Sequence, residues 1–293
     1  MLIPLDRHPL RFSLAVAMTA SPMETRMKKT FALLFLFSMP HAAEARELCT
    51  VFADAETGKV FFKRGEHCDQ RVTPASSFKI AISLMGFDSG FLKDEHSPRL
   101  PFKQGYPDWR PSWREATDPA KWMKESVVWF SQQITQALGP ERFAKYVRDF
   151  GYGNEDASGD AGKDNGLTRA WLSSSLKISP LEQIAFLEKI VNRRLPVSAS
   201  AYEMTGKITL IDAPPAGWEL HGKTGSGAPV LPGGAQDEAH FYGWFVGWGI
   251  KGQRKIVFAR LTQDEKREAE SSGLRARDGL LKELPSILNS QSD

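Results

Sequence analysis

Ser76 and Lys79 lie three positions apart at the start of the apolar run TPASSFKIAISLMGF (73–87). On a helix this spacing places both side chains on one face. A serine at a helix N-terminus lies beside backbone N–H groups that favour a developing oxyanion. Lys79 can serve as its base only when deprotonated, and burial favours the neutral amine. An N-cap serine beside a lysine that extends to water fits the same spacing, so both interpretations stay open at this point.

Two further stretches contain residues of matching chemistry. HGKTGSG (221–227) places Lys223-Thr224-Gly225 on a predicted strand, offering a cation, a hydroxyl and room for close backbone approach. Alone it also fits an edge-strand lysine beside a turn, but S-x-x-K followed by K-T-G is the combination of penicillin-recognising serine enzymes. In ESVVW (125–129), Ser126 is expected inside an apolar helix. A serine there either bonds its own helix or passes a proton to a leaving nitrogen.

Helices in the middle of the chain and strands at its two ends must position these residues. We expect a hairpin over 49–65, a core helix over 74–87, helices over 118–138, 140–150 and 179–195, and a last helix over about 273–288. Three aromatic and β-branched runs after residue 200 predict an antiparallel meander that the hairpin joins. The expected fold is α+β, with a sheet lobe (about 46–75 and 200–293), an inserted helical lobe (76–199) and a substrate cleft between them.

The N-terminal segment indicates export. MKKTFALLFLFSMPHAAEA (27–45) has a positive start, a short apolar core and an Ala-x-Ala end, the layout of a secretory signal peptide. The apolar run 31–39 is too short to span a bilayer. We therefore expect 1–26 to be a non-translated or dispensable extension, cleavage after Ala45, and a single catalytic domain over 46–293 in the periplasm without a membrane anchor.

Composition excludes several classes of protein. Of the 293 residues, 41% are hydrophobic and 25% are charged, which is typical of a folded globular chain and disfavours disorder. The net charge of +3 comes from dispersed lysines and arginines, without a basic block interleaved with aromatics, so nucleic acid is not an expected partner.

Metal chemistry is also disfavoured. The six histidines are scattered without H-x-H or H-E-x-x-H spacing. The aspartates of the polar loop GNEDASGDAGKDNG (153–166) lack the calcium-loop order, so a solvated loop is expected there. The only cysteines, Cys49 and Cys68, are candidates for a single disulfide in an oxidising compartment, and the sequence leaves open whether the disulfide forms.

Five motifs in one order decide between families. Together they resemble the class D serine β-lactamases, the oxacillinase group, over essentially the whole mature chain. The motifs are Ser76-Ser77-Phe78-Lys79, Ser126-Val127-Val128, Tyr152-Gly153-Asn154, Trp171-Leu172 and Lys223-Thr224-Gly225. The S-D-N and E-x-x-L-N motifs of class A enzymes are not in the chain.

The resemblance implies roles for the catalytic residues. Ser76 would open the β-lactam ring and form an acyl-enzyme. Lys79 would react with CO2, so that carbon dioxide or bicarbonate replaces any metal or organic cofactor, and the resulting N6-carboxylysine would be the general base. Trp171 would hold that carbamate through its indole N–H. Ser126 would carry a proton to the lactam nitrogen, assisted by the charge of Lys223.

The resemblance also implies substrate-binding residues. The backbone N–H groups of Ser76 and Ser226 would form the oxyanion hole beside Gly225. Thr224 would hold the substrate carboxylate with an arginine of the last helix, for which we choose Arg275 over Arg277. Val128 and Leu172 are expected to be apolar gates around the carbamate, with core packing as the alternative. Tyr152 is expected either to take part in catalysis or to form a wall.

Three other functions compete with a β-lactamase. A sensor domain of the same fold would be acylated without turnover, a transpeptidase would share S-x-x-K and K-T-G but not the Trp171 element, and a binding protein would have the fold alone. The expected partners are β-lactam antibiotics, and the chain is expected to be a monomer or weak dimer. The tryptophans of YPDWRPSWRE (106–115) belong either to a substrate-side loop or to packing of the helical lobe.

Overall fold

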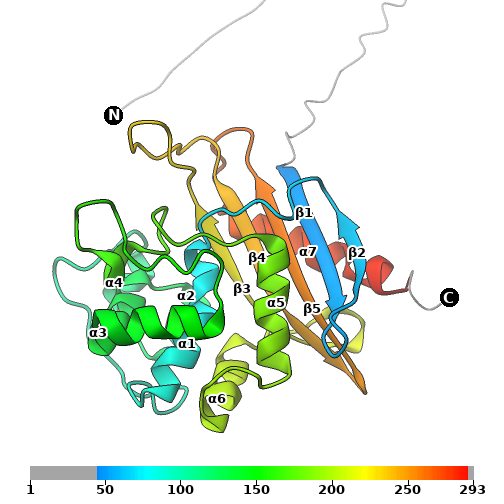
Figure 1. The fold of residues 1–293 in the computed structure, drawn as a ribbon, viewed down its shortest axis with the longest axis horizontal. Coiled ribbons are helices and arrows are strands. Elements are labelled where there is room, and N and C mark those ends of the chain that lie inside the picture. Colours follow the sequence, from blue (N-terminus) through cyan, green and yellow to red (C-terminus); the bar gives the residue numbers. More distant parts are fainter. Residues whose placement is uncertain (1–44, 290–293) are drawn as a thin grey trace, which may run out of the picture. The chain divides into compact units, whose positions relative to one another are not determined.

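Strands from both ends of the chain form one antiparallel sheet in the order β2-β1-β5-β4-β3. The computed structural model describes residues 45–289, so the predicted extension 1–26 and all of the predicted signal peptide except Ala45 lie outside the described residues. Figure 1 shows the N-terminal hairpin beside the C-terminal meander, as the sequence predicted. The strands are β1 (Arg46–Asp54), β2 (Val60–Arg64), β3 (Glu219–Gly227), β4 (Tyr242–Lys251) and β5 (Arg254–Gln263).

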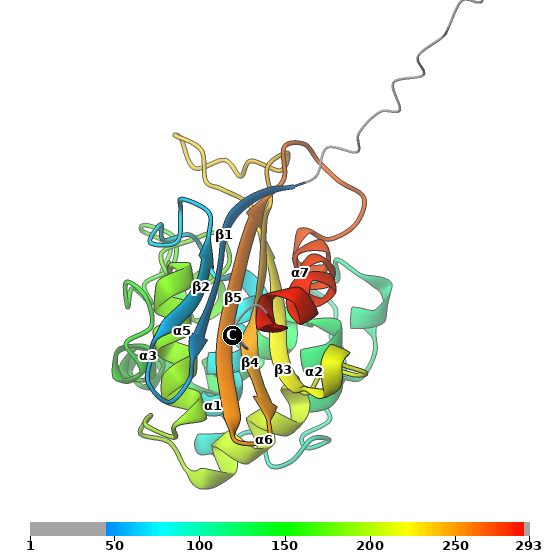
Figure 2. The same ribbon diagram turned by 90° about the vertical axis from the view of Figure 1, so that its right-hand side faces the viewer.

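Helices cover both faces of the sheet. Helix α7 (Ser272–Asn289) lies on one face, and the helices of the middle segment lie on the other, which Figure 2 shows with the sheet nearly edge-on. Successive side chains of β4 point to opposite faces of the sheet. Trp244 and Val246 belong to the core on the helical side, whereas Phe245 packs with the residues beneath α7. The predicted α+β fold with an inserted helical segment is confirmed.

The helix predicted over 118–138 is interrupted. Helix α2 (Pro119–Glu125) ends at Ser126, whose backbone is left-handed (φ 60°, ψ 35°), and Val127 is extended before α3 (Val128–Phe150) begins. The expectation that Ser126 lies inside a helix is therefore wrong. Because a left-handed conformation is costly for a residue with a Cβ, it persists only where surrounding contacts hold it, commonly at functional sites.

Other helices agree more closely with the sequence. Ser76 lies in a 3₁₀ turn, η1 (Ala75–Phe78), which leads into the buried helix α1 (Lys79–Asp88). The capping box of Ser179 and Glu182 begins α5 (Pro180–Val191). Gly139, in a non-helical conformation before Pro140, separates the two segments predicted over 118–138 and 140–150. The short α4 (Gly166–Arg169) and α6 (Ala199–Thr209) were not predicted.

Cys49 and Cys68 are joined by a disulfide, which ties β1 to the segment before η1. Within residues 45–289, no helix is both long and apolar enough to cross a membrane. The same residues contain no group of three or more histidine, cysteine, aspartate or glutamate side chains placed to hold a metal ion.

Candidate active site

A cavity of about 180 Å³ brings together residues from most of the predicted motifs. It lies where η1, the junction of α2 and α3, strand β3 and the start of α7 meet. Its lining includes the predicted residues Ser76, Ser126, Val128, Leu172, Thr224, Gly225 and Ser226. Residues that are 50 to 150 positions apart in the sequence therefore share one site, since Ser76 precedes Ser126 by 50 positions and Ser226 by 150.

Ser76 and Lys79 are in direct contact within this site. Lys79 is fully buried, and its Nζ donates a hydrogen bond of 3.1 Å to Ser76 Oγ. Burial lowers the pKa of Lys79 well below its usual value, and the charges of Lys223 and Arg110 lower it further. Burial therefore disfavours the ammonium form beside the hydroxyl, and a snorkelling lysine is excluded because no part of the side chain reaches water.

Lys223 is the second buried lysine. Its Nζ donates to the carbonyl oxygen and the hydroxyl of Thr224 at 3.0 and 3.2 Å. Burial lowers the pKa of Lys223 to about 7, with smaller effects from the charges of Arg110 and Arg277. A lysine with this pKa exchanges its proton near neutral pH, which suits a group that stabilises charge or assists proton transfer.

The indole of Trp171 has an unsatisfied donor. Its Nε1 is the only buried side-chain nitrogen or oxygen in residues 45–289 without a hydrogen-bond partner. Thr73 holds this segment in place, since its hydroxyl donates to Trp171 O and accepts from Ser173 N. An unpaired buried N–H costs about 1–3 kcal/mol, so this donor is a strong indication of a missing acceptor.

Gly225 allows β3 to approach the turn that carries Ser76. A Cβ at this position would lie 2.8 Å from Pro74 O and 2.9 Å from Ser77 N, which only glycine avoids. The next residue, Ser226, shares a hydrogen bond of 2.7 Å with Ser271 and accepts one from Gly273 N. These contacts fix β3 against both η1 and the start of α7.

Arg275, the arginine chosen from the sequence, does not line the candidate cavity. Arg275 lines a different cavity and forms an ion pair with the buried Asp264. Arg277, three positions along α7 from the cavity residue Leu274, is the one whose charge lowers the pKa of Lys223. Arg277 does not line the cavity itself, and its guanidinium forms an ion pair of 2.7 Å with Asp278.

Tyr152 occupies a structural position. It is fully buried, accepts a hydrogen bond of 3.2 Å from Gln183 Nε2, and packs edge-on against Phe78. Burial raises its pKa. Gln183 also contacts Ser77 Oγ, so Ser77 and Tyr152 belong to a polar network behind the reactive turn. These contacts favour the wall or structural role over a catalytic one.

Sequence reasoning missed Arg110, Lys124, Ser271 and Leu274 of the lining and left open whether Trp109 and Trp113 face the substrate or pack against the helical lobe. The two tryptophans of YPDWRPSWRE have different positions: Trp113 is buried and donates to Glu125 O, whereas Trp109 is 65% exposed at the rim. The signal that was available is the concentration of aromatic and basic residues in a proline-rich loop, which is typical of a surface that contacts ligands.

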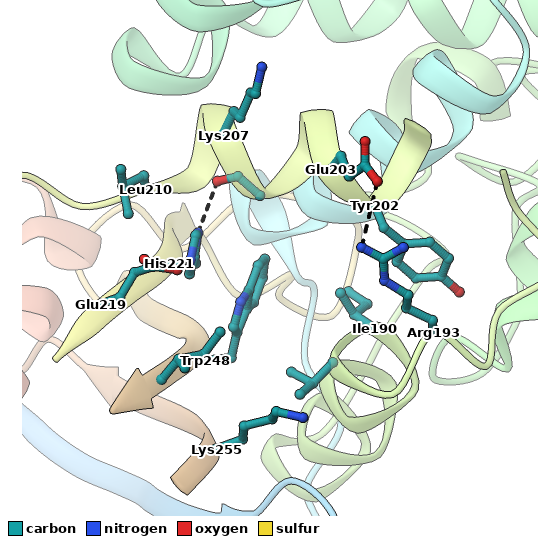
Figure 3. A pocket seen from close by; sticks show the side chains of 13 residues that line it. Ile190, Arg193, Tyr202, Glu203, Lys207, Leu210, Glu219, His221, Trp248 and Lys255 are labelled. Atoms are coloured by element: carbon teal, nitrogen blue, oxygen red, sulfur yellow. Dashed lines mark hydrogen bonds and ion pairs between the residues drawn. The ribbon is translucent and has the colours of Figure 1, made fainter. Parts of the chain in front are cut away.

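A larger cavity of about 430 Å³ lies between α5, α6 and the strands β3, β4 and β5. Figure 3 shows the His221 ring beside Trp248, with centroids 4.8 Å apart, and the ion pair between Arg193 and Glu203. His221 Nδ1 is 2.9 Å from Gly206 O. None of the candidate residues lines this cavity, and it lacks a nucleophile beside a base, so the smaller cavity is the candidate active site.

Comparisons with known proteins agree on one group. The family "Penicillin binding protein transpeptidase domain" matches residues 48–285. Beta-lactamase OXA-9 of Klebsiella pneumoniae is 47% identical over 247 residues, which cover 83% of this chain and 89% of the relative. Beta-lactamase OXA-1 of Escherichia coli is 41% identical over 219 residues, 73% and 75% of the two chains. The crystal structure of the class D β-lactamase OXA-427 superimposes with a TM-score of 0.78 at 47% identity and covers 83% of this chain and 98% of that chain.

Proposed function

This chain belongs to the class D β-lactamases, enzymes that hydrolyse β-lactam antibiotics, and from that premise we propose that it acts through an acyl-enzyme on Ser76. The observation that supports this most directly is the hydrogen bond of 3.1 Å from the buried Lys79 to Ser76 Oγ. A serine hydroxyl within hydrogen-bond distance of a buried amine with a lowered pKa is an arrangement that nucleophilic catalysis can use.

We propose that Lys79 is carboxylated by CO2. Two features of the site fit this group: a buried amine whose lowered pKa keeps it nucleophilic, and the unpaired N–H of Trp171, which can donate to an anion. Carboxylation would convert the amine into an anionic carbamate, whose oxygens can accept a proton from Ser76 or from water. Val128 and Leu172 are the apolar residues expected to limit the access of water to it.

The protons then follow a short route. The base on Lys79 takes the proton of Ser76, and Ser76 Oγ attacks the lactam carbonyl. The C–N bond breaks, and Ser126 donates its proton to the leaving nitrogen and recovers one from the protonated base on Lys79, assisted by Lys223, so that the base is free again. In the second half-reaction the same base activates water, which releases the open-ring acid and returns the proton to Ser76. Every group in this sequence belongs to one cavity or lies directly beneath it.

Other groups of the site are assigned to substrate binding. The backbone N–H groups of Ser76 and Ser226 are proposed to stabilise the oxyanion. The ring carboxylate would bind Thr224 and the guanidinium of Arg277, in place of Arg275. The close approach that Gly225 permits between β3 and η1 supports the first assignment, because it brings the two backbones together.

Export is the remaining part of the proposal. Residues 27–45 would act as a signal peptide and 46–293 as the mature catalytic domain, a monomer or weak dimer in the periplasm. The disulfide between Cys49 and Cys68 is consistent with an oxidising compartment.

Turnover of a chromogenic cephalosporin tests the function directly. We expect repeated hydrolysis in the presence of bicarbonate. A single stoichiometric burst would instead identify a sensor-like acceptor, and the absence of any reaction would identify a binding protein. Either of these results would contradict the proposal.

Removing the indole donor of Trp171 should weaken the base. Trp171→Phe keeps the aromatic ring and deletes the N–H, so we expect deacylation to slow about 10–100-fold and the bicarbonate concentration needed for half-maximal activity to rise. Stopped-flow kinetics against bicarbonate concentration measures both. Trp122→Phe is the matched control, because Trp122 is equally buried and loses its own hydrogen bond to Ser131 away from Lys79. Wild-type bicarbonate dependence in Trp171→Phe would exclude the assigned role.

A further inference from the structure

The cavity around Ser76 has cations at its rim and no acidic residue. Arg110 and Lys124 both line it, and no aspartate or glutamate does. The charge of Arg110 is strong enough there to lower the pKa of both Lys79 and Lys223. A cleft lined by charge of one sign raises the local concentration of ligands of the opposite sign, so this cavity favours an anionic ligand.

The side chains of Arg110 and Lys124 are exposed. Within residues 45–289 neither forms an ion pair or a hydrogen bond with another residue. Neighbours that do not line the cavity are paired: Arg114 with Asp108, and Lys121 with Glu115. The two unpaired cations are therefore the two that point to the site.

These cations lie on a different wall from Arg277. Arg110 precedes the 3₁₀ turn η2 (Pro111–Arg114), and Lys124 is in the last turn of α2. The hydrogen bond of 2.9 Å from Trp113 Nε1 to Glu125 O joins these two segments into one wall of the helical lobe. Arg277 is on α7, which packs against β3 on the sheet side. The ring carboxylate of a β-lactam is assigned above to residues of the sheet side, Thr224 and Arg277.

We propose that Arg110 and Lys124 form a subsite for a second anionic group, a carboxylate carried by the acyl side chain of the β-lactam. The inference rests on the proposed function and adds a substrate class to it: dianionic β-lactams. Trp109, which is 65% exposed at the same rim with its ring 5.5 Å from that of Trp113, offers an aromatic surface for a phenyl group next to that carboxylate. An aryl side chain with an α-carboxylate matches both features.

Benzylpenicillin and carbenicillin test this proposal, because they differ by only one carboxylate on the side chain. The quantity measured is the ratio of kcat/KM for carbenicillin to kcat/KM for benzylpenicillin. Effects of Arg110 on Lys79 and Lys223 act on both substrates and cancel in this ratio. We expect Arg110→Gln to lower the ratio about threefold and Arg110→Gln with Lys124→Gln about tenfold, the range for exposed charge pairs. Arg110→Lys should restore most of it.

Arg114→Gln is the control, since Arg114 is in the same segment but paired with Asp108 and away from the cavity; its ratio should equal that of the wild type. The wild-type ratio should also fall as salt rises, because exposed charges are screened. An unchanged ratio in the double variant would overturn the proposal, and so would equal losses for both penicillins, which would assign these cations to the ring carboxylate. If the wild type hydrolyses neither penicillin, the proposed function itself has failed.

Discussion

Ser76→Ala is expected to abolish covalent labelling by a fluorescent penicillin and to reduce turnover by on the order of 10⁶. The Ser76 hydroxyl has one hydrogen-bond partner in residues 45–289, the amine of Lys79, so we expect the variant to fold. Intact-protein mass spectrometry measures the acyl adduct, and thermal unfolding checks the fold.

The adjacent serine provides the control for this experiment. Ser77 is buried, donates a hydrogen bond of 2.7 Å to Pro74 O, and contacts Gln183 rather than Lys79. Ser77→Ala should lower stability by about 1 kcal/mol and keep the adduct. An adduct on Ser76→Ala, or its loss in a folded Ser77→Ala, would place the nucleophile elsewhere.

Lys79→Met is expected to have the second-largest effect. It keeps an unbranched side chain one atom shorter and removes the amine, so the proposed base is no longer there to activate water in deacylation. We expect the acyl-enzyme, if it forms, to persist, with steady-state turnover lower by about 10⁴-fold or more. A burst of one equivalent followed by no further hydrolysis would be the kinetic signature. Rapid release of product would exclude Lys79 as the base.

The same lysine can be observed directly. With ¹³C-labelled bicarbonate, wild-type enzyme should give a carbamate signal that Lys79→Met lacks. Lys189→Met, which alters a partly buried lysine bonded to Phe150 O, should keep the signal. Only the neutral amine reacts with CO2, so lowering the pH through the depressed pKa of Lys79 should remove the carbamate and the activity together, and added bicarbonate should restore them. Active enzyme without the signal would contradict the assignment.

Much of the fold and site could be predicted because local pattern and global arrangement agree. The aromatic and β-branched runs after residue 200 form β4 and β5, which are buried over most of their length, and the prediction of their antiparallel pairing is confirmed. The capping residues Ser179 and Glu182 fix the start of α5. Residues three apart lie on one face of a 3₁₀ turn as well as of an α-helix. The predicted contact between Ser76 and Lys79 therefore forms although Ser76 lies in a 3₁₀ turn and not in the predicted helix.

The features that were missed depend on tertiary contacts. The apolar periodicity runs through Ser126 without interruption, so nothing in the local pattern marks the left-handed residue between α2 and α3. Arg275 and Arg277 are two positions apart in the sequence. The packing of α7 places Arg275 beside the buried Asp264 and outside the candidate cavity, which the local pattern does not reveal. Arg110 and Lys124 are ordinary exposed cations in the sequence, and their shared wall arises from the hydrogen bond between Trp113 and Glu125.

The pairing of β1 with β5 also determines when this enzyme can become active. Arg260 on β5 donates a hydrogen bond to Thr50 on β1, 210 residues away, so β1 can complete its pairing only after β5 has been made. Contacts this distant in the sequence must overcome a large loop-closure entropy, which slows folding. Because β3 is held in place through β4 and β5, the reactive turn and its sheet wall can meet only after nearly the whole chain has been made. An incomplete chain therefore has no assembled site, and the start of catalysis coincides with the closing of the sheet.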